Sequence, residues 1–362
     1  MLVCVGPLPD PITGQSIAFE KYVKNSDFKP KVFDTSAPFG RGDTYKLLSR
    51  LVVLWSYFIF LIKNEVQVLY ITTSRTGFGF FSDAAFILLF KYICKGKVIN
   101  HLHGADFLLF RCGNRFKYII DFVYKKIDCS IVLTNGMARE YQPYGNMNIK
   151  VVQNFSEINL PIEIIDSKFI KGSNRKLEVL YMSNILYSKG VFELLDASES
   201  LIKSGFDFKI VFCGDFAADD FKSKSDIKNE FISRIEKLDF VDFLGPVKGI
   251  EKRKIFEQAN IFCLPTFYKT EAQPISIFEA MGAGCVVVTT RHNFLTDYLN
   301  DDMVVFSEPR DSISLEVALK RVVCEYDKYQ EMVRLNHYRV LEENTIIQYT
   351  KSIDNIIKET LR

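Results

Sequence analysis

Two hydrophobic patterns alternate along the chain: short, nearly continuous apolar runs, and longer stretches in which an apolar residue recurs every three or four positions. The first pattern predicts buried β-strands and the second predicts amphipathic helices. Because the two alternate twice over, the sequence predicts an α/β protein with two Rossmann-like, doubly wound parallel sheets. The predicted strands lie near 2–6, 31–34, 66–72, 97–103, 129–134 and 149–153 in the first half, and near 177–182, 208–213, 241–244, 261–264, 285–290 and 303–306 in the second.

The length of 362 residues suits two domains better than one hydrophobic core. Residues 161–175 are polar and irregular, which predicts a linker between a first domain at 1–160 and a second at 176–342. Residues from about 343 to 362 form a last helical segment.

Charge and cysteine content limit the partners and the compartment. A net charge of +2 argues against a nucleic-acid binder, which would carry a strongly basic domain. Residues 91–126 nevertheless contain eight Lys or Arg against two Asp, a net charge of +6, and this predicts an anionic partner. The eight scattered cysteines lie mostly in apolar runs and show no C-x-x-C pair, so we expect buried thiols in a reducing, cytoplasmic setting.

One helical segment of the first half is almost wholly apolar. It runs from Leu51 to Ile62, is bounded by Arg50 and Lys63, contains the only tryptophan, and is shorter than the ~20 residues that span a bilayer. One hypothesis is that this helix and the basic stretch rest peripherally on an anionic membrane at its inner face. The alternative is a helix buried between the sheet and its neighbours. A second apolar stripe is expected to face the core and comprises Phe116, Ile119, Ile120, Val123, Tyr124 and Ile127.

The segment E-A-Q-P-I-S-I-F-E, residues 271–279, carries the most specific candidate chemistry. Pro274 can begin a helix, whose first N–H groups, at Ile275 and Ser276, would then bind a diphosphate. On that helix Glu279 is expected to project away from the core-facing residues and to accept hydrogen bonds from a ribose diol. Glu271, in the preceding loop, would reach the sugar.

This spacing resembles the E-x7-E signature of retaining glycosyltransferases of the glycosyl transferases group 1 family, which is sucrose-synthase-like or glycogen-synthase-like and has the GT-B fold. The resemblance implies that a hexose-type sugar moves from a UDP-sugar or GDP-sugar donor to a saccharide or polyprenyl-linked acceptor in surface polysaccharide synthesis. It implies retention of configuration and no metal or other cofactor. It also implies that the last helix packs back on the first domain.

Other segments match the same family. H-L-H-G-A-D, residues 101–106, resembles its acceptor-side motif, which assigns His103 and Asp106 to the acceptor. Lys189, in Y-S-K-G, resembles the lysine that neutralises the leaving diphosphate, but Ser183-Asn184 stands where many relatives have Gly-Arg, so a second cation is missing. The implied catalytic residues are Glu271, His103 and Lys189; the implied donor-binding residues are Gly14, Asn184, Lys189, Gln273, Pro274, Ile275, Ser276 and Glu279.

Several alternatives stay open at this point. His101 and His103 alternate as zinc ligands can, but no further His or Cys stands at a ligand spacing, so a metal site is not expected. A nucleotide-sugar epimerase or a phosphorylase can use the same fold; an epimerase would act without an acceptor, and a phosphorylase would show pyridoxal absorbance. A non-catalytic sugar-nucleotide-binding or scaffold paralogue is the third alternative. The missing Gly-Arg pair makes it conceivable, whereas the presence of both glutamates, Lys189 and His103 argues against it.

Overall fold

The computed structural model describes residues 1–36, 43–145, 147–170 and 176–362. These form two compact units. Unit 1 contains Met1–Asn154 together with Ile346–Arg362, and unit 2 contains Phe155–Thr345.

Unit 1 is built on a six-stranded, all-parallel sheet, as the sequence predicted. Its inner strands are buried because helices cover both faces. The strand order is β2-β1-β3-β4-β5-β6. The strands are β1 Leu2–Gly6, β2 Lys31–Asp34, β3 Val68–Thr72, β4 Lys97–His101, β5 Cys129–Val132 and β6 Asn148–Val151.

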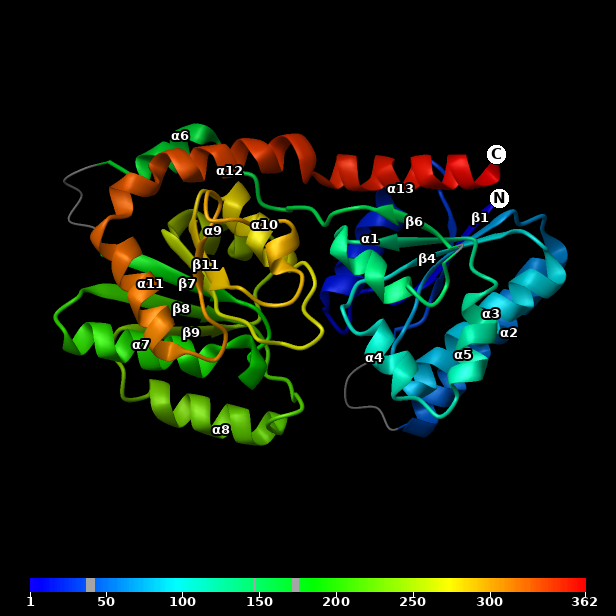
Figure 1. Cartoon of the computed structure of the whole chain (residues 1–362), viewed down its shortest axis with the longest axis horizontal. Helices are drawn as coiled ribbons and strands as arrows, with labels where there is room; N and C mark the ends of the chain where they lie inside the picture. The colour runs from blue at the N-terminus through cyan, green and yellow to red at the C-terminus, as the bar shows by residue number, and fades with distance from the viewer. Residues whose placement is uncertain (37–42, 146, 171–175) are drawn as a thin grey trace. The chain divides into compact units, whose positions relative to one another are not determined.

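The helices of unit 1 divide between the two faces of this sheet. Because crossovers are right-handed, the reversal of strand order at β1 puts α1 on one face and α2, α3 and α5 on the other. The helix α13 packs beside α1 (Figure 1). It is fastened by buried Asp354, whose Oδ1 accepts hydrogen bonds from the Tyr22 hydroxyl at 3.0 Å and the Ser26 hydroxyl at 2.8 Å. The helices are α1 Gly14–Asn25, α2 Asp43–Lys63, α3 Gly77–Ile93, α4 Phe107–Cys112, α5 Lys117–Tyr124, η1 Gly136–Tyr141 (3-10) and α13 Ile346–Leu361.

Unit 2 repeats the plan with the strand order β12-β11-β10-β7-β8-β9. Its strands are β7 Leu177–Met182, β8 Phe208–Cys213, β9 Val241–Gly245, β10 Ile261–Leu264, β11 Val286–Thr290 and β12 Val305–Ser307. Its helices are α6 Ile162–Ser167, η2 Tyr187–Lys189, α7 Val191–Lys203, α8 Lys224–Ile235, α9 Gly249–Gln258, α10 Ile275–Gly282, η3 Leu295–Asp297, α11 Ser312–Cys324, η4 Tyr326–Tyr329 and α12 Gln330–Glu343.

The structure corrects the prediction of a linker at residues 161–175. The unit boundary follows Asn154, and residues 162–167 of the expected linker form helix α6 inside unit 2. Just beyond it, the buried Lys168 ammonium donates hydrogen bonds to the carbonyls of Phe256 at 2.9 Å, Ala259 at 2.7 Å and Ala283 at 2.8 Å. Lys168 is one of the polar residues of this segment, yet three backbone acceptors satisfy its charge within the fold. Residues 171–175 of the expected linker lie outside the described residues.

Two expectations about burial were also wrong in part. Cys112 and Cys324 are exposed, whereas the thiols of the buried strands β1, β5, β8 and β10 are enclosed. Ile119 was expected to face the core, but its side chain is 43% exposed on α5. Within the described residues, no helix is both long enough and apolar enough to cross a bilayer.

In each sheet the strand order reverses at one point, between β1 and β3 in unit 1 and between β7 and β10 in unit 2. Chain segments diverge there beyond the carboxyl ends of the strands, and ligands of open parallel sheets bind at such switch points. The predicted site residues follow these strands or their neighbours.

Candidate functional site

A buried ion pair lies at the switch point of unit 2. Lys189 follows β7 and ends η2, while Glu271 lies in the loop that follows β10. The Lys189 Nζ is 2.5 Å from the Glu271 Oε2, and their side chains are 11% and 8% exposed. The Thr266 hydroxyl donates a second hydrogen bond to the same oxygen at 2.9 Å. The structure thus brings together two of the three residues that were predicted to be catalytic.

The loops that carry the pair are bound to one another. The Ser188 N–H and hydroxyl both donate to Asp219 Oδ2 at 2.7 Å, and the Ser188 carbonyl accepts from the Phe267 N–H at 2.8 Å. On the other side, the Tyr268 carbonyl lies 3.0 Å from the His292 Nε2. These bonds hold the two loops to each other and to neighbouring loops, and such support holds a functional pair in place.

Gly190 joins the lysine to α7 and has no room for a side chain. Its φ is +78°, and an added Cβ would lie 2.1 Å from the Pro265 carbonyl oxygen in the opposite loop. We expect Gly190→Ala to lower the free energy of unfolding by roughly 2–4 kcal/mol, because the strained φ and the clash act together. Urea unfolding measures this, with Gly205→Ala as the matched control: its φ is +89° but its added Cβ would contact nothing within 4 Å. Equal losses for both variants would refute the steric part of the argument.

The structure also corrects the prediction for Glu279. It was expected to project freely from its helix, yet it is 1% exposed, and its Oε1 is 2.5 Å from the Nζ of Lys252 on α9. The helix α10 packs against α12, and all of its residues except Ser276 are buried, so its polar face is also enclosed. Each glutamate of the E-x7-E segment is therefore paired with a lysine from a different element.

The sequence predicted that Pro274 occupies the first position of α10, but the helix begins one residue later. Pro274 is the N-cap and Ile275 is the first helical residue. Gln273 and Ile275 are buried, whereas Pro274 and Ser276 are partly exposed. After β7, Asn184 is exposed, and its carbonyl accepts a hydrogen bond from the Tyr181 hydroxyl at 2.9 Å.

In unit 1 the predicted acceptor histidine is stacked on a second histidine. The ring centroids of His101 and His103 are 4.1 Å apart, and the His101 Nδ1 is 2.7 Å from the Tyr70 hydroxyl. Burial, with a smaller contribution from Arg75, lowers the pKa of His103 to about 3, so the ring is neutral at pH 7. Its buried Nε2 has no hydrogen-bond partner among the described residues.

Asp106, the other acceptor-side prediction, forms a half-buried ion pair with Arg75, which follows β3. Gly104 makes room for that arginine, because an added Cβ would lie 2.3 Å from its Nη2. Gly14 begins α1, but it is exposed, and an added Cβ there would contact nothing within 4 Å. Gly14 therefore meets no close neighbour among the described residues of its unit.

Arg75, Thr266 and Lys252 are the residues of these sites that the sequence did not single out. Each is an ordinary polar residue in a loop or an exposed-looking helix, and only the fold brings it to its partner. Groups of three or more His, Cys, Asp or Glu that could hold a metal ion do not occur in the described part of the chain.

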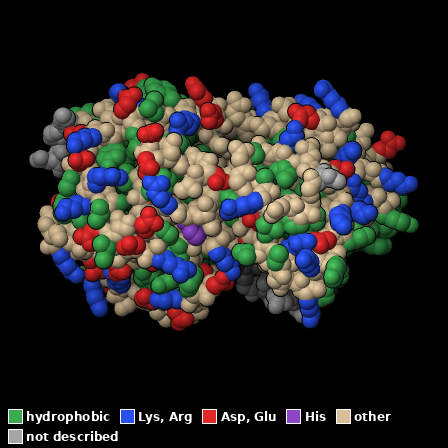
Figure 2. All heavy atoms as spheres, in the orientation of Figure 1, with side chains coloured by type: hydrophobic (Ala, Val, Ile, Leu, Met, Phe, Trp, Pro, Cys, Tyr) green, Lys and Arg blue, Asp and Glu red, His purple; other side chains and the backbone are tan. Residues whose placement is uncertain are grey.

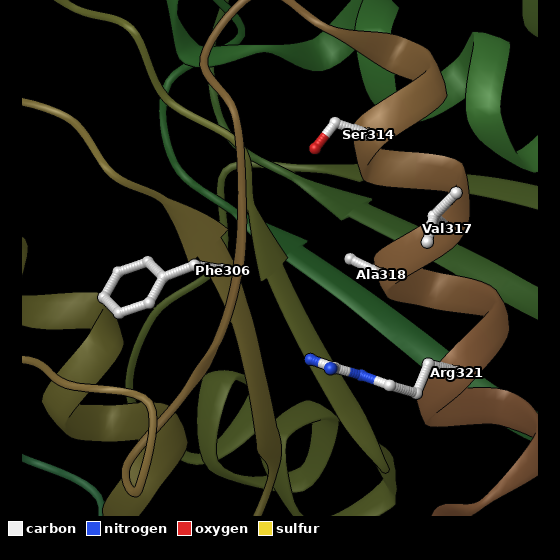
Figure 3. A pocket seen from close by; sticks show the side chains of 5 residues that line it. All are labelled: Phe306, Ser314, Val317, Ala318 and Arg321. Carbon is white, nitrogen blue, oxygen red and sulfur yellow. The ribbon is translucent and has the colours of Figure 1, made fainter.

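A hollow of about 340 Å³ lies elsewhere in unit 2. Four of its lining side chains, Ser314, Val317, Ala318 and Arg321, come from α11, and Phe306 comes from the edge strand β12 (Figure 3). It shares no residue with the Lys189–Glu271 pair and lies at the edge of the sheet, so we place the functional site at the switch point instead.

The chain was also compared with known proteins. Residues 163–337 match the family described as glycosyl transferases group 1. The chain is 19% identical over 216 residues to a putative colanic acid biosynthesis glycosyltransferase, WcaL of Escherichia coli (strain K12); the match covers 58% of this chain but only 51% of that relative. It is 22% identical to an uncharacterised glycosyltransferase, MJ1607 of Methanocaldococcus jannaschii, with 75% and 70% of the two chains covered. Anabaena HepE, solved in complex with UDP, superposes with a TM-score of 0.73 at 14% identity over 99% of this chain and all of its own.

Proposed function

We propose that the chain is a retaining glycosyltransferase, because residues 163–337 match the glycosyl transferases group 1 family and the fold is GT-B. It moves a hexose-type sugar from a nucleoside-diphosphate donor to a saccharide or polyprenyl-linked saccharide in surface polysaccharide synthesis, at the cytoplasmic side. The observation that carries this proposal is the buried Lys189–Glu271 pair at the switch point of the family domain.

In this proposal the donor binds to unit 2. The Lys189 ammonium has three N–H donors, of which Glu271 takes one, and the others stabilise the charge that develops on the departing diphosphate. The first N–H groups of α10 add the positive end of a helix dipole. Glu271 accepts hydrogen bonds from sugar hydroxyls and Glu279 from the ribose. A UDP-sugar or a GDP-sugar fits these roles, and HepE binding UDP supports the first.

His103 acts on the acceptor side in unit 1. A neutral imidazole can accept a proton or a hydrogen bond from a sugar hydroxyl, and its buried Nε2 is available among the described groups. We propose that the departing phosphate itself assists the attack and that the protein contributes positioning and electrostatic stabilisation. The diphosphate charge is met by Lys189 and the helix end, so we propose that no metal is required.

The first experiment is calorimetric titration of UDP, GDP and ADP into the protein with excess chelator. We expect one nucleotide to bind selectively, because base contacts discriminate while Lys189 and α10 hold any diphosphate. The surface variant Lys209→Met, which removes an exposed ion pair with Asp242, is the control and should bind equally well. Binding that needs divalent metal would contradict the metal-free proposal. Absence of binding by all three would favour a non-catalytic paralogue, and turnover of a nucleotide sugar without acceptor would indicate an epimerase.

A further inference from the structure

The outer face of α2 is an exposed apolar stripe. This face of the helix exposes Leu48, Leu51, Val52, Trp55 and Ile62, whose side chains are 51–68% exposed. The opposite side of the helix buries Tyr57 and Leu61 against unit 1. Burying large apolar side chains is worth about 1.5–3 kcal/mol each, so a contiguous stripe left in water indicates a partner.

The stripe continues onto the neighbouring helices. The Arg50 guanidinium on α2 donates to the Ser82 hydroxyl on α3 at 3.3 Å, and the Phe81 ring on α3 lies 5.1 Å from the Phe116 ring before α5. We call this combined area the α2–α3–α5 surface. Besides the α2 stripe it exposes Phe78, Phe81, Tyr118, Ile119 and Phe122.

Exposed cations accompany these apolar side chains, and the acids Asp121 and Asp128 are already paired. The Arg115 guanidinium lies 4.7 Å from the Phe116 ring, and the Lys126 ammonium lies 5.2 Å from the Phe122 ring. Asp121 accepts two hydrogen bonds from Arg111, which lower its pKa, and Asp128 pairs with Lys91. The exposed cations are Lys63, Arg115, Lys117, Lys125 and Lys126. Figure 2 shows hydrophobic and basic side chains intermixed over the end of unit 1 that these helices form.

We propose that the α2–α3–α5 surface docks on an anionic lipid bilayer, with the apolar side chains inserted shallowly and the cations at the headgroups. Aromatic and aliphatic side chains beside Lys and Arg are the composition of an interfacial membrane contact. A second copy of the chain fits less well, because a symmetric dimer would bring the same basic patch face to face with itself. The docking rests on the proposed function only in that it places the lipid-linked acceptor beside unit 1; membrane binding is measured without turnover.

Trp55 is a built-in probe because it is the only tryptophan in the chain. The protein is titrated at low salt with vesicles of phosphatidylglycerol and phosphatidylcholine, and separately with phosphatidylcholine alone. We expect a blue shift of the Trp55 emission, quenching by bromine-labelled acyl chains, and sedimentation with the anionic vesicles that decreases as salt is added. The neutral vesicles should bind far less protein.

Two variants separate the contributions. The double variant Lys125→Gln/Lys126→Gln should bind anionic vesicles roughly 30-fold more weakly, because each basic residue near an anionic surface contributes about 1 kcal/mol. Val52→Glu should abolish the blue shift while leaving Trp55 in place. The matched controls are Lys351→Gln, an exposed lysine on α13, and Ile250→Glu, a 77% exposed isoleucine in unit 2, and both should partition like the wild type.

The results of these experiments distinguish an anionic bilayer from a second copy of the chain as the partner of the α2–α3–α5 surface. An unshifted Trp55 spectrum with anionic vesicles overturns the proposal, and so does a dimer in sedimentation that dissociates with Val52→Glu while vesicles are ignored. Calorimetric UDP and GDP titration of the same variants keeps the two proposals apart. Retained nucleotide binding with lost vesicle binding supports a membrane surface that is separate from the donor site.

Discussion

Replacing Lys189 by Met is expected to lower kcat by about 10²–10³-fold. That range is the measured consequence of removing one group that stabilises developing charge in an active site. Methionine keeps most of the volume of the lysine side chain, so the variant removes the ammonium rather than the packing. Initial rates with the nucleotide sugar identified by calorimetry, under saturating donor, measure the effect.

The same substitution has a structural consequence that must be separated from catalysis. It leaves Glu271 buried, with its side chain 8% exposed. Of the two groups that contact its Oε2, the Lys189 ammonium and the Thr266 hydroxyl, only the hydroxyl remains. Removing one partner of a buried ion pair costs roughly 3–5 kcal/mol, whereas removing both charges costs far less. The double variant Lys189→Met/Glu271→Gln should therefore recover most of the stability in urea unfolding while its kcat stays as low as that of the single variant. Recovery of activity together with stability would assign the pair a purely structural role.

The control for that experiment is another ion pair in the same unit. Lys209 and Asp242 are 40% and 48% exposed, so Lys209→Met should change stability by less than about 1 kcal/mol and should leave kcat unchanged.

The architecture could be predicted from the sequence because the information that specifies it is local. Most strands of the described residues are short apolar runs bounded by turn residues, and the inner strands of a parallel sheet, which are buried on both faces, read in that way. The switch-point position of Lys189 and Glu271 follows from the strand order, which only the structure gives. The fold was confirmed by comparison with solved structures, and residues 163–337 match the glycosyl transferases group 1 family; the roles of the individual site residues remain predictions.

The errors have a common physical cause, which is that a helical pattern shows where apolar residues lie but not what covers the other side. Glu279 looked exposed on a half-apolar helix, yet Lys252 from a different helix encloses it. Ile119 fits a core-facing stripe by spacing, yet the layer of α2, α3 and α5 ends there and leaves it exposed. Lys168 looked like part of a solvated linker because three carbonyls from distant segments are invisible in the local sequence. Pairing between remote segments is the information that a single sequence lacks.

Glu279→Ala should weaken binding of the cognate nucleoside diphosphate by roughly 10- to 150-fold, which corresponds to about 1.5–3 kcal/mol for a charge-assisted hydrogen bond. The burial of Glu279 strengthens this expectation, because a carboxylate enclosed at 1% exposure and held by Lys252 is already oriented and loses little entropy on binding. Calorimetry with excess chelator measures the change.

Replacing Glu279 also breaks its buried ion pair with Lys252, which can disturb the local structure. A loss of nucleotide affinity alone therefore does not prove a ribose contact. The discriminating ligand is the 2′,3′-dideoxy form of the same nucleotide, which lacks the diol that Glu279 is proposed to bind. Wild type should bind the dideoxy ligand as weakly as Glu279→Ala binds the natural one, and the variant should bind both ligands alike. Lys252→Met serves as the matched test of the pair: it leaves the carboxylate but removes its orienting partner, so it should reduce the preference for the natural ligand without abolishing it. If Glu279→Ala weakens both ligands equally, the carboxylate supports the fold of α10 and the ribose is recognised elsewhere.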